Sequence, residues 1–178
     1  MLEFARLERA TDVKFVPLTY KCQEVDTLVD IGGGTGHVAV TMAKTFPQLN
    51  IIVEDQAKSI AEAKSTVPVE LQDRIRLVES DFFQPRHVEN AAVCKTKTFF
   101  LRPILHNWSD ANAKRVIEPL LPSIRDGPKL LIMDMMVPPP GTVPETMELW
   151  IRGLDMEIMI HSTWCRNRKQ FGHGISIR

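Results

Sequence analysis

Apolar residues along this 178-residue chain gather in five short runs, separated by segments of a different periodicity. Each run is mostly apolar without strict alternation, which is typical of strands buried on both faces of a parallel sheet. The five runs are TLVDI (27–31), NIIVED (50–55), RIRLVES (74–80), KTFFLRPIL (97–105) and KLLIMDMMV (129–137). The pattern therefore predicts five strands.

The segments between these runs have helical spacing. One helix is expected directly after the first run, where Pro47 stops the pattern, and a short second helix over 56–66. Ser109 can cap a third helix, which Pro119 should end or bend early. A last helix is expected after the rigid, proline-rich connection 138–144. Alternating strands and helices predict a doubly wound α/β domain with a mostly parallel sheet, in which ligands bind at the carboxyl ends of the strands.

Composition narrows the classes of function. The chain has 22 basic and 22 acidic residues, so no charge excess favours a nucleic-acid or membrane partner. Its cysteines, Cys22, Cys94 and Cys165, are widely spaced and form no CxxC pair, which argues against a disulfide framework and against a metal site. No apolar signal core or membrane-length run is present. We therefore expect a cytoplasmic protein.

A glycine-rich loop directly follows the first predicted strand, with the sequence DIGGGTG from Asp30 to Gly36. Glycines there allow positive φ and close approach of the backbone to a ligand, and the helix start offers free N–H groups. The pattern is D-x-G-x-G-x-G, because His37 stands where the dinucleotide fingerprint needs its third glycine. No GK[ST] follows, so the loop is not a P-loop. The alternative is an ordinary turn between a strand and a helix.

Acidic and aromatic residues follow the second and third predicted strands. Asp55 stands 19 residues beyond Gly36, where an acid can accept hydrogen bonds from both ribose hydroxyls. Glu54 is a competing candidate, and either acid could instead cap the next helix. Asp81 could contact an adenine amino group and Phe82 could stack on the ring, although both also suit a turn and a core.

Five motifs occur in the order of a known family. They are VDIGGGTGH, VEDQ, DFF, FFLRPILHNWSD and LLIMDMMVPPPG. Over roughly residues 27–160, the chain resembles plant- and fungal-type small-molecule O-methyltransferases, which include caffeic acid, flavonoid and fungal polyketide methyltransferases. The resemblance implies the Rossmann-like class I methyltransferase fold, the cofactor S-adenosylmethionine with S-adenosylhomocysteine as product, and methyl transfer to a phenolic or enolic hydroxyl of a secondary metabolite.

The resemblance also implies roles for individual residues. His106 stands in the H-x-W-S-D element as the general base, because histidine accepts a proton near neutral pH. Asp134 stands where an acid would orient the histidine ring. The positions that would hold the cofactor are Asp30, Gly32, Gly34 and Gly36 at its methionine part, Asp55 at the ribose, Asp81 and Phe82 at the adenine, and Arg102 as a further basic contact.

The chain departs from the family pattern at both ends. A lead-in of residues 1–26 stands where the family has a helical domain of about a hundred residues. The last two strands of the family sheet, whose order is 3-2-1-4-5-7-6, are not found, so the fifth strand becomes an apolar edge. The tail 161–178 is basic, and Glu157 is the last acid of the chain. The family has a second acid beside its histidine in the segment that corresponds to this tail. Met156 and Met159 could contact an aromatic acceptor or simply belong to the core.

These departures leave two main hypotheses of different classes, so enzymatic activity is not decided by the sequence. The resemblance also implies a third, in which bound cofactor assists a ring-forming reaction without methyl transfer, but no residue favours it. The first is an O-methyltransferase acting on a small aromatic or polyketide-like acceptor. The second is a catalytically inactive remnant or interaction module that keeps only the cofactor-binding core. In either case the exposed edge of the fifth strand predicts homo-oligomer formation.

Overall fold

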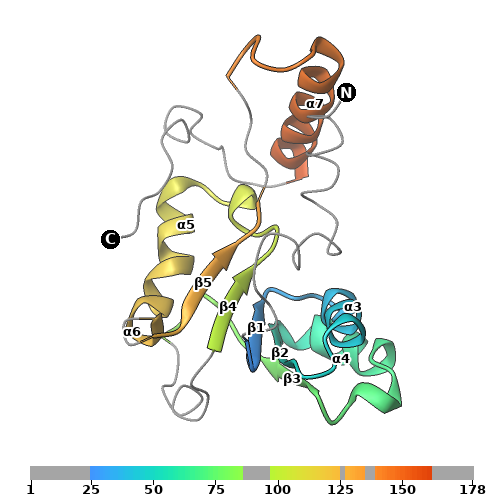
Figure 1. The fold of residues 1–178 in the computed structure, drawn as a ribbon. Helices are drawn as coiled ribbons and strands as arrows, with labels where there is room; N and C mark the ends of the chain where they lie inside the picture. Colours follow the sequence, from blue (N-terminus) through green and yellow to red (C-terminus); the bar gives the residue numbers. More distant parts are fainter. Residues whose placement is uncertain (1–24, 86–96, 125–126, 135–138, 162–178) are drawn as a thin grey trace.

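A computed structural model of the protein describes residues 25–85, 97–124, 127–134 and 139–161. Its sheet has five parallel strands in the order β3-β2-β1-β4-β5, with helices on both faces (Figure 1). The strands are β1 (Thr27–Ile31), β2 (Asn50–Asp55), β3 (Ile75–Glu79), β4 (Lys97–Leu101) and β5 (Lys129–Ile132). The predicted doubly wound α/β fold and the strand order implied by the family resemblance are therefore confirmed.

The helices follow the predicted positions closely. Ser109 is the N-cap of the helix after the fourth strand, and its Oγ accepts a hydrogen bond from the Asn112 N–H at 3.4 Å. That helix ends at Ile117, just before Pro119, as the sequence predicted. The helical elements are α3 (His37–Thr45), α4 (Ala57–Thr66), η3 (Val69–Leu71), η5 (Leu105–Asn107), α5 (Asp110–Ile117), η6 (Glu118–Leu120), α6 (Leu121–Ile124) and α7 (Glu145–His161).

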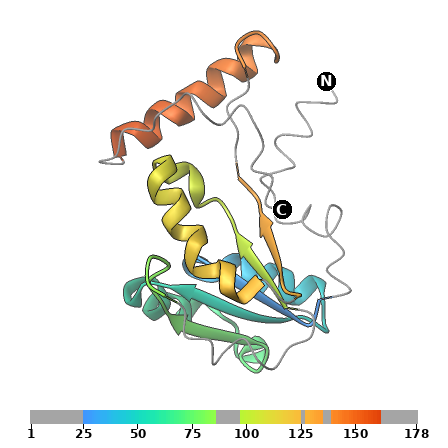
Figure 2. The ribbon, with the colours of Figure 1, turned by 90° about the vertical axis from the view of Figure 1, so that its left-hand side faces the viewer.

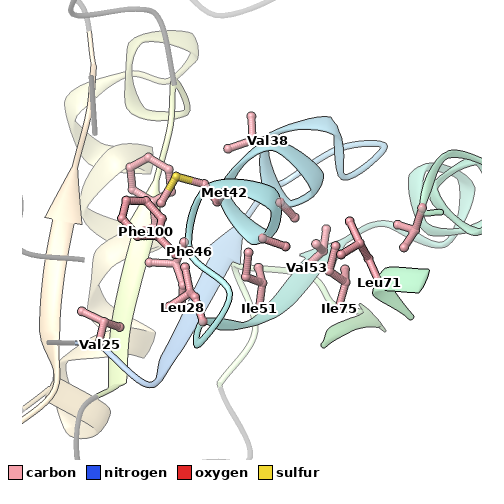
Figure 3. Packing of buried hydrophobic residues seen from close by; sticks show 14 of the residues in the cluster. Val25, Leu28, Val38, Met42, Phe46, Ile51, Val53, Leu71, Ile75 and Phe100 are labelled. Atoms are coloured by element: carbon pink, nitrogen blue, oxygen red, sulfur yellow. The ribbon is translucent and has the colours of Figure 1, made fainter. Parts of the chain in front are cut away.

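Two apolar layers lie on opposite faces of the sheet. On one face, α3 and α4 pack over side chains of all the strands from β3 to β4, with Ile51, Val53 and Phe100 buried beneath them (Figure 3). On the other face, α5 packs over Val29 and Phe99. Figure 2, a view at right angles to Figure 1, shows α5 and α6 on one side of the sheet and α3 on the other. Burial on both faces is the reason the strands read as unbroken apolar runs.

The fourth and fifth strands are shorter than their apolar runs. β4 ends at Leu101, because Pro103 has no N–H and restricts the residue before it, so the chain leaves the sheet and forms η5. β5 ends at Ile132, although the Met133 N–H still donates to the Leu101 carbonyl at 2.9 Å. The remainder of the predicted fifth strand, after residue 134, lies outside the described residues.

Helix α7 stands apart from the sheet in both views (Figure 1, Figure 2). Its Met147 and Ile151 are buried, whereas Leu149 and Trp150 are exposed. Among the residues described, no helix has the length and apolar character needed to cross a bilayer. The lead-in 1–26 and the tail 161–178 lie almost wholly outside the described residues, as do all three cysteines, so the division of the chain into these segments stays a prediction.

Candidate active site

The parallel register gathers the predicted site residues at one edge of the sheet. Asp30 is the penultimate residue of β1 and pairs with Val53 of β2. Asp55 is the last residue of β2, and Asp81 is the second residue after the end of β3. The remaining members of this edge are the glycine loop after β1, Phe82 after β3, Arg102 and His106 after β4, and Asp134 after β5.

The glycine loop is held against the end of β2 by three hydrogen bonds. The N–H groups of Gly32 and Gly33 donate to the Glu54 carbonyl at 2.7 and 3.3 Å, and the Gly34 N–H donates to Oδ2 of Asp55 at 2.8 Å. Gly32, Gly34 and Gly36 have φ values of 70°, 59° and 78°, which other residues rarely adopt. The backbone conformation of the loop therefore favours glycine at these three positions.

Asp55 is the acid that joins this loop, rather than its neighbour Glu54. Oδ1 of Asp55 also accepts from the Gln56 N–H at 2.7 Å, so the carboxylate bridges the loop and the start of α4. Glu54 is 5% exposed and contributes its backbone carbonyl. Each carboxylate oxygen of Asp55 has a second lone pair, so it can accept further hydrogen bonds from hydroxyl groups of a ligand.

Asp30 lies under the glycine loop and is 2% exposed. Its Oδ2 is buried and has no hydrogen-bond partner among the described residues. Burial, partly offset by the Arg102 charge and reinforced by the Asp55 charge, raises the pKa of Asp30 from 3.8 to about 7. Arg102 thus lies close enough to act on the acid of the loop, from the segment after β4.

The loop has the space and the polar groups that a nucleoside ligand with a cationic end would need. A Cβ added at Gly34 would meet no protein atom within 4 Å, so one side of the loop is open. At Gly32 the side chain of Ile104 already fills the position of a Cβ, at 2.5 Å. The buried carboxyl of Asp30 is suited to a positive charge, and Asp55 to hydroxyl groups. The residues present therefore fit the cofactor that the family resemblance implies.

Asp81 and Phe82 lie where the sequence placed them, but they differ in their surroundings. Both carboxylate oxygens of Asp81 hold its own turn, accepting from the Phe83 N–H at 2.9 Å and from Nε2 of Gln84 at 3.3 Å. Phe82 lies 3.9 Å from the Cβ position of Gly32, so it adjoins the loop. Its role toward an adenine ring stays a prediction, as does that of Asp81.

An aromatic cluster beside the loop was missed by the sequence analysis. The rings of Phe82, Phe83 and Trp108 pack edge to face, with centroids 4.9 to 6.0 Å apart. The guanidinium of Arg115 lies 5.2 Å from the Phe83 centroid. Trp108 lies within the HNWSD motif, so the motif itself was the available signal. The cluster packs the turn after β3 against the turn after β4.

His106 and Asp134 form a buried pair. His106 is 9% exposed, and its Nδ1 lies 2.5 Å from Oδ1 of Asp134. Oδ2 of Asp134 accepts the backbone N–H groups of Leu105 at 2.8 Å and of His106 at 3.2 Å. One carboxylate thus fixes both the η5 turn and the ring. If Nδ1 carries the hydrogen that Asp134 accepts, the neutral ring keeps the Nε2 lone pair for another group.

The two methionines proposed to contact an acceptor come from α7, and not from the segments that form this edge of the sheet. Met156 lies in α7 and is 58% exposed. Met159 lies in the same helix, but its side chain is outside the described residues. Their contact with an acceptor stays a prediction. Within the part of the chain that the structure describes, no three histidine, cysteine or acidic side chains are grouped as a metal site would need.

The fold and its site define the class of α/β proteins that bind a ligand at the carboxyl edge of a parallel sheet. Comparison with known proteins gives the family. The model of the O-methyltransferase domain family matches residues 10–175, so the chain belongs to that family.

The relatives found among curated proteins are fungal O-methyltransferases. The chain is 35% identical to O-methyltransferase FrzF of Cladobotryum sp over 147 residues, which is 82% of this chain and 33% of that protein. It is 39% identical to O-methyltransferase VdtC of Byssochlamys spectabilis over 137 residues, covering 74% of this chain and 30% of that protein. The chain therefore matches about a third of the length of these curated relatives.

Solved structures with the same fold include the mitomycin 7-O-methyltransferase MmcR, with a TM-score of 0.66 and 23% identity. The match covers 83% of this chain and 41% of that one. Human N-acetylserotonin methyltransferase, solved in complex with S-adenosylmethionine, gives a TM-score of 0.65 at 22% identity, covering 81% and 39% of the two chains. At this identity the likeness concerns the fold.

Proposed function

We propose that this chain binds S-adenosylmethionine over its glycine loop and transfers the methyl group to a hydroxyl of a small aromatic or polyketide-like acceptor. The observation that carries the proposal is the pairing of His106 with Asp134 at the same sheet edge as the glycine loop. Membership of the O-methyltransferase family supports the proposal. So do two solved proteins of this fold whose structures contain naphthoic acid or apigenin ligands.

In this mechanism, the glycine loop and Asp55 would hold the cofactor, Asp30 and Arg102 would act on its charged end, and Phe82 would contact the adenine. When bound, S-adenosylmethionine supplies an electrophilic methyl group on a sulfonium centre. Nε2 of His106 takes the proton of the acceptor hydroxyl as its oxygen attacks, and Asp134 stabilises the imidazolium that forms. The protein supplies position and the base.

The test is methyl transfer by the purified chain and by His106→Ala, with 1,4-dihydroxy-2-naphthoic acid and apigenin as probe acceptors. We expect S-adenosylhomocysteine to accumulate with the unaltered chain, and its rate of formation to fall by about 10²-fold or more in His106→Ala. Cofactor affinity, measured by calorimetry, should be unchanged, because His106 is not among the residues proposed to hold the cofactor. Asn107→Ala, a change at the exposed next residue of the same turn, should keep both properties.

Three outcomes would decide between the functions. No cofactor binding at millimolar concentration would reject the proposal. Binding without methyl transfer to any phenol would favour the binding-only module. Equal loss of binding and transfer in His106→Ala would mean that the residue is structural.

We also propose that the protein forms homo-oligomers through the outer edge of β5. Support comes from the pairing of β5, which among the described residues is with β4 alone. The cytoplasmic location expected from the sequence stays a prediction.

A further inference from the structure

Asp30 is a buried acid without a hydrogen bond at one of its oxygens, within the part of the chain that the structure describes. Such a group in a protein interior is costly when ionised, unless a charge or a donor stabilises it. Strand β1 could carry an apolar residue here at no loss to the core, since Leu28 and Phe100 surround this face. The acid is therefore better explained by a ligand than by packing.

The position of Asp30 relative to the loop is fixed by Gly33. A Cβ added to Gly33 would lie 2.7 Å from Oδ2 of Asp30 and 2.9 Å from Cγ1 of Val53. Gly33 does not have a positive φ, so its backbone conformation does not require glycine. Glycine is needed there because a side chain would overlap its neighbours. The unpartnered oxygen thus lies directly against the backbone of the loop.

The charges that act on this carboxyl come from two directions. Asp55 lies at the end of β2 and Arg102 follows β4, and their effects on the Asp30 pKa are opposite, while burial is the largest effect. The register partners of Asp30 on both neighbouring strands, Val53 and Phe100, are apolar. Glu54 pairs with Ile31 and so belongs to the opposite face of the sheet.

Helix α3 covers the same face, and the residues it buries there are Val38, Ala39, Met42 and Ala43, all apolar. Its first residue, His37, is exposed. His37 is therefore a further ionisable side chain beside the loop, and it needs its own control.

We propose that Asp30 gives up its proton when the cationic aminosulfonium end of the cofactor binds over the glycine loop, so that cofactor uptake releases a proton. The inference rests on the proposed function. The step is an exchange: the carboxylic acid becomes a carboxylate, the proton goes to solvent, and the positive charge of the ligand takes its place. An opposite charge nearby stabilises the ionised acid. By linkage, cofactor affinity rises with pH until Asp30 is ionised in the free protein, and is then constant.

The experiment is isothermal titration of the full chain with S-adenosylmethionine at pH 6, 7 and 8, in phosphate and in imidazole buffers. The difference in heat between buffers counts the protons released. We expect about half a proton per cofactor at pH 7, and an affinity about tenfold higher at pH 8 than at pH 6. Adenosine, which has no cationic end, should bind without proton release. S-adenosylhomocysteine keeps the ammonium but not the sulfonium, so its proton count shows which of the two charges acts.

Two variants show which residue releases the proton. Asp30→Asn should bind the cofactor with no proton release and with the same affinity at every pH. His37→Gln should behave as the unaltered chain. Cofactor binding with heats independent of buffer would overturn the inference and leave the proposed function intact. Proton release with adenosine, or its loss in His37→Gln alone, would also overturn it. No binding at pH 8 would overturn both proposals.

Discussion

At Gly33 an added methyl group would overlap Asp30 and Val53, whereas at the next residue it would meet open space. Gly34 instead has a φ of 59°, which strains any other residue. We therefore expect Gly33→Ala to lower the free energy of unfolding by about 3 kcal/mol, through overpacking. Gly34→Ala should cost about 1 kcal/mol and weaken cofactor binding, because its methyl group lies on the open side of the loop.

Urea denaturation of both variants, with calorimetry of cofactor binding, checks this prediction. The two variants carry the same chemical change at adjacent positions and so control for each other. A Gly33→Ala protein as stable as the Gly34→Ala protein would contradict the packing of Asp30 against the loop.

The sequence identified most polar residues of the candidate site but not the apolar contacts that hold them. Asp30, Asp55 and His106 occur in motifs whose chemistry is visible in the residue type. Ile104 fills the Cβ position of Gly32, which lies far from it in the sequence, and Gly33 adjoins Val53 of the neighbouring strand. The sequence alone does not show such contacts. The choice between the candidate acids Asp55 and Glu54 depends on the hydrogen bond from Gly34 to Asp55, which only the structure shows.

At the scale of elements, Arg74 connects helix α3 to the segment before β3. Its guanidinium donates to the Ala43 carbonyl at 2.9 Å and to those of Phe46 and Leu49 at 3.2 and 3.3 Å. These groups lie at and just beyond the end of α3, where helix carbonyls have no partner within the helix. Arg74→Met should therefore lower the free energy of unfolding by about 2–3 kcal/mol.

Arg76→Met is the matched control for Arg74, because Arg76 is exposed and the change in charge is the same. It should alter stability by less than about 0.5 kcal/mol. Thermal or urea unfolding measures both. If the two variants lost equal stability, net charge rather than the cap on α3 would be the cause.

Element types were predictable because periodicity and caps are local, and element ends were less so. The end of α5 was predictable from Ser109 and Pro119. The end of β4 was missed although Pro103 marks it in the sequence, because the apolar run continues through Ile104 and Leu105 after the strand has stopped at Leu101. Those two residues are apolar for a different reason: they pack beside the loop and in the layer under α5. Burial alone does not tell a strand from a turn that is packed against it.

At the scale of the whole molecule, the sheet ends at β5 within the described residues, and that edge has apolar side chains. Leu131 is partly buried and Ile132 is 36% exposed. A parallel strand with a free edge can pair with another chain, and natural proteins avoid this with charges at the edge. A second exposed apolar surface lies on α7, where Leu149 is 65% exposed and Trp150 is 48% exposed. Either surface is apolar enough for self-association, and we propose that the β5 edge forms the interface.

The two surfaces can be separated by one substitution in each. Ile132→Lys places a charge at the β5 edge, so light scattering over a range of concentrations should give the mass of a single chain, where the unaltered protein gives at least a dimer. Leu149→Lys places the same charge on α7 and should leave the oligomer intact, because α7 is not part of the β5 edge. Dissociation by Leu149→Lys alone would move the interface to α7. A single-chain mass for the unaltered protein at every concentration would reject the oligomer, and would leave the candidate site at the carboxyl edge of the sheet as the property of one chain.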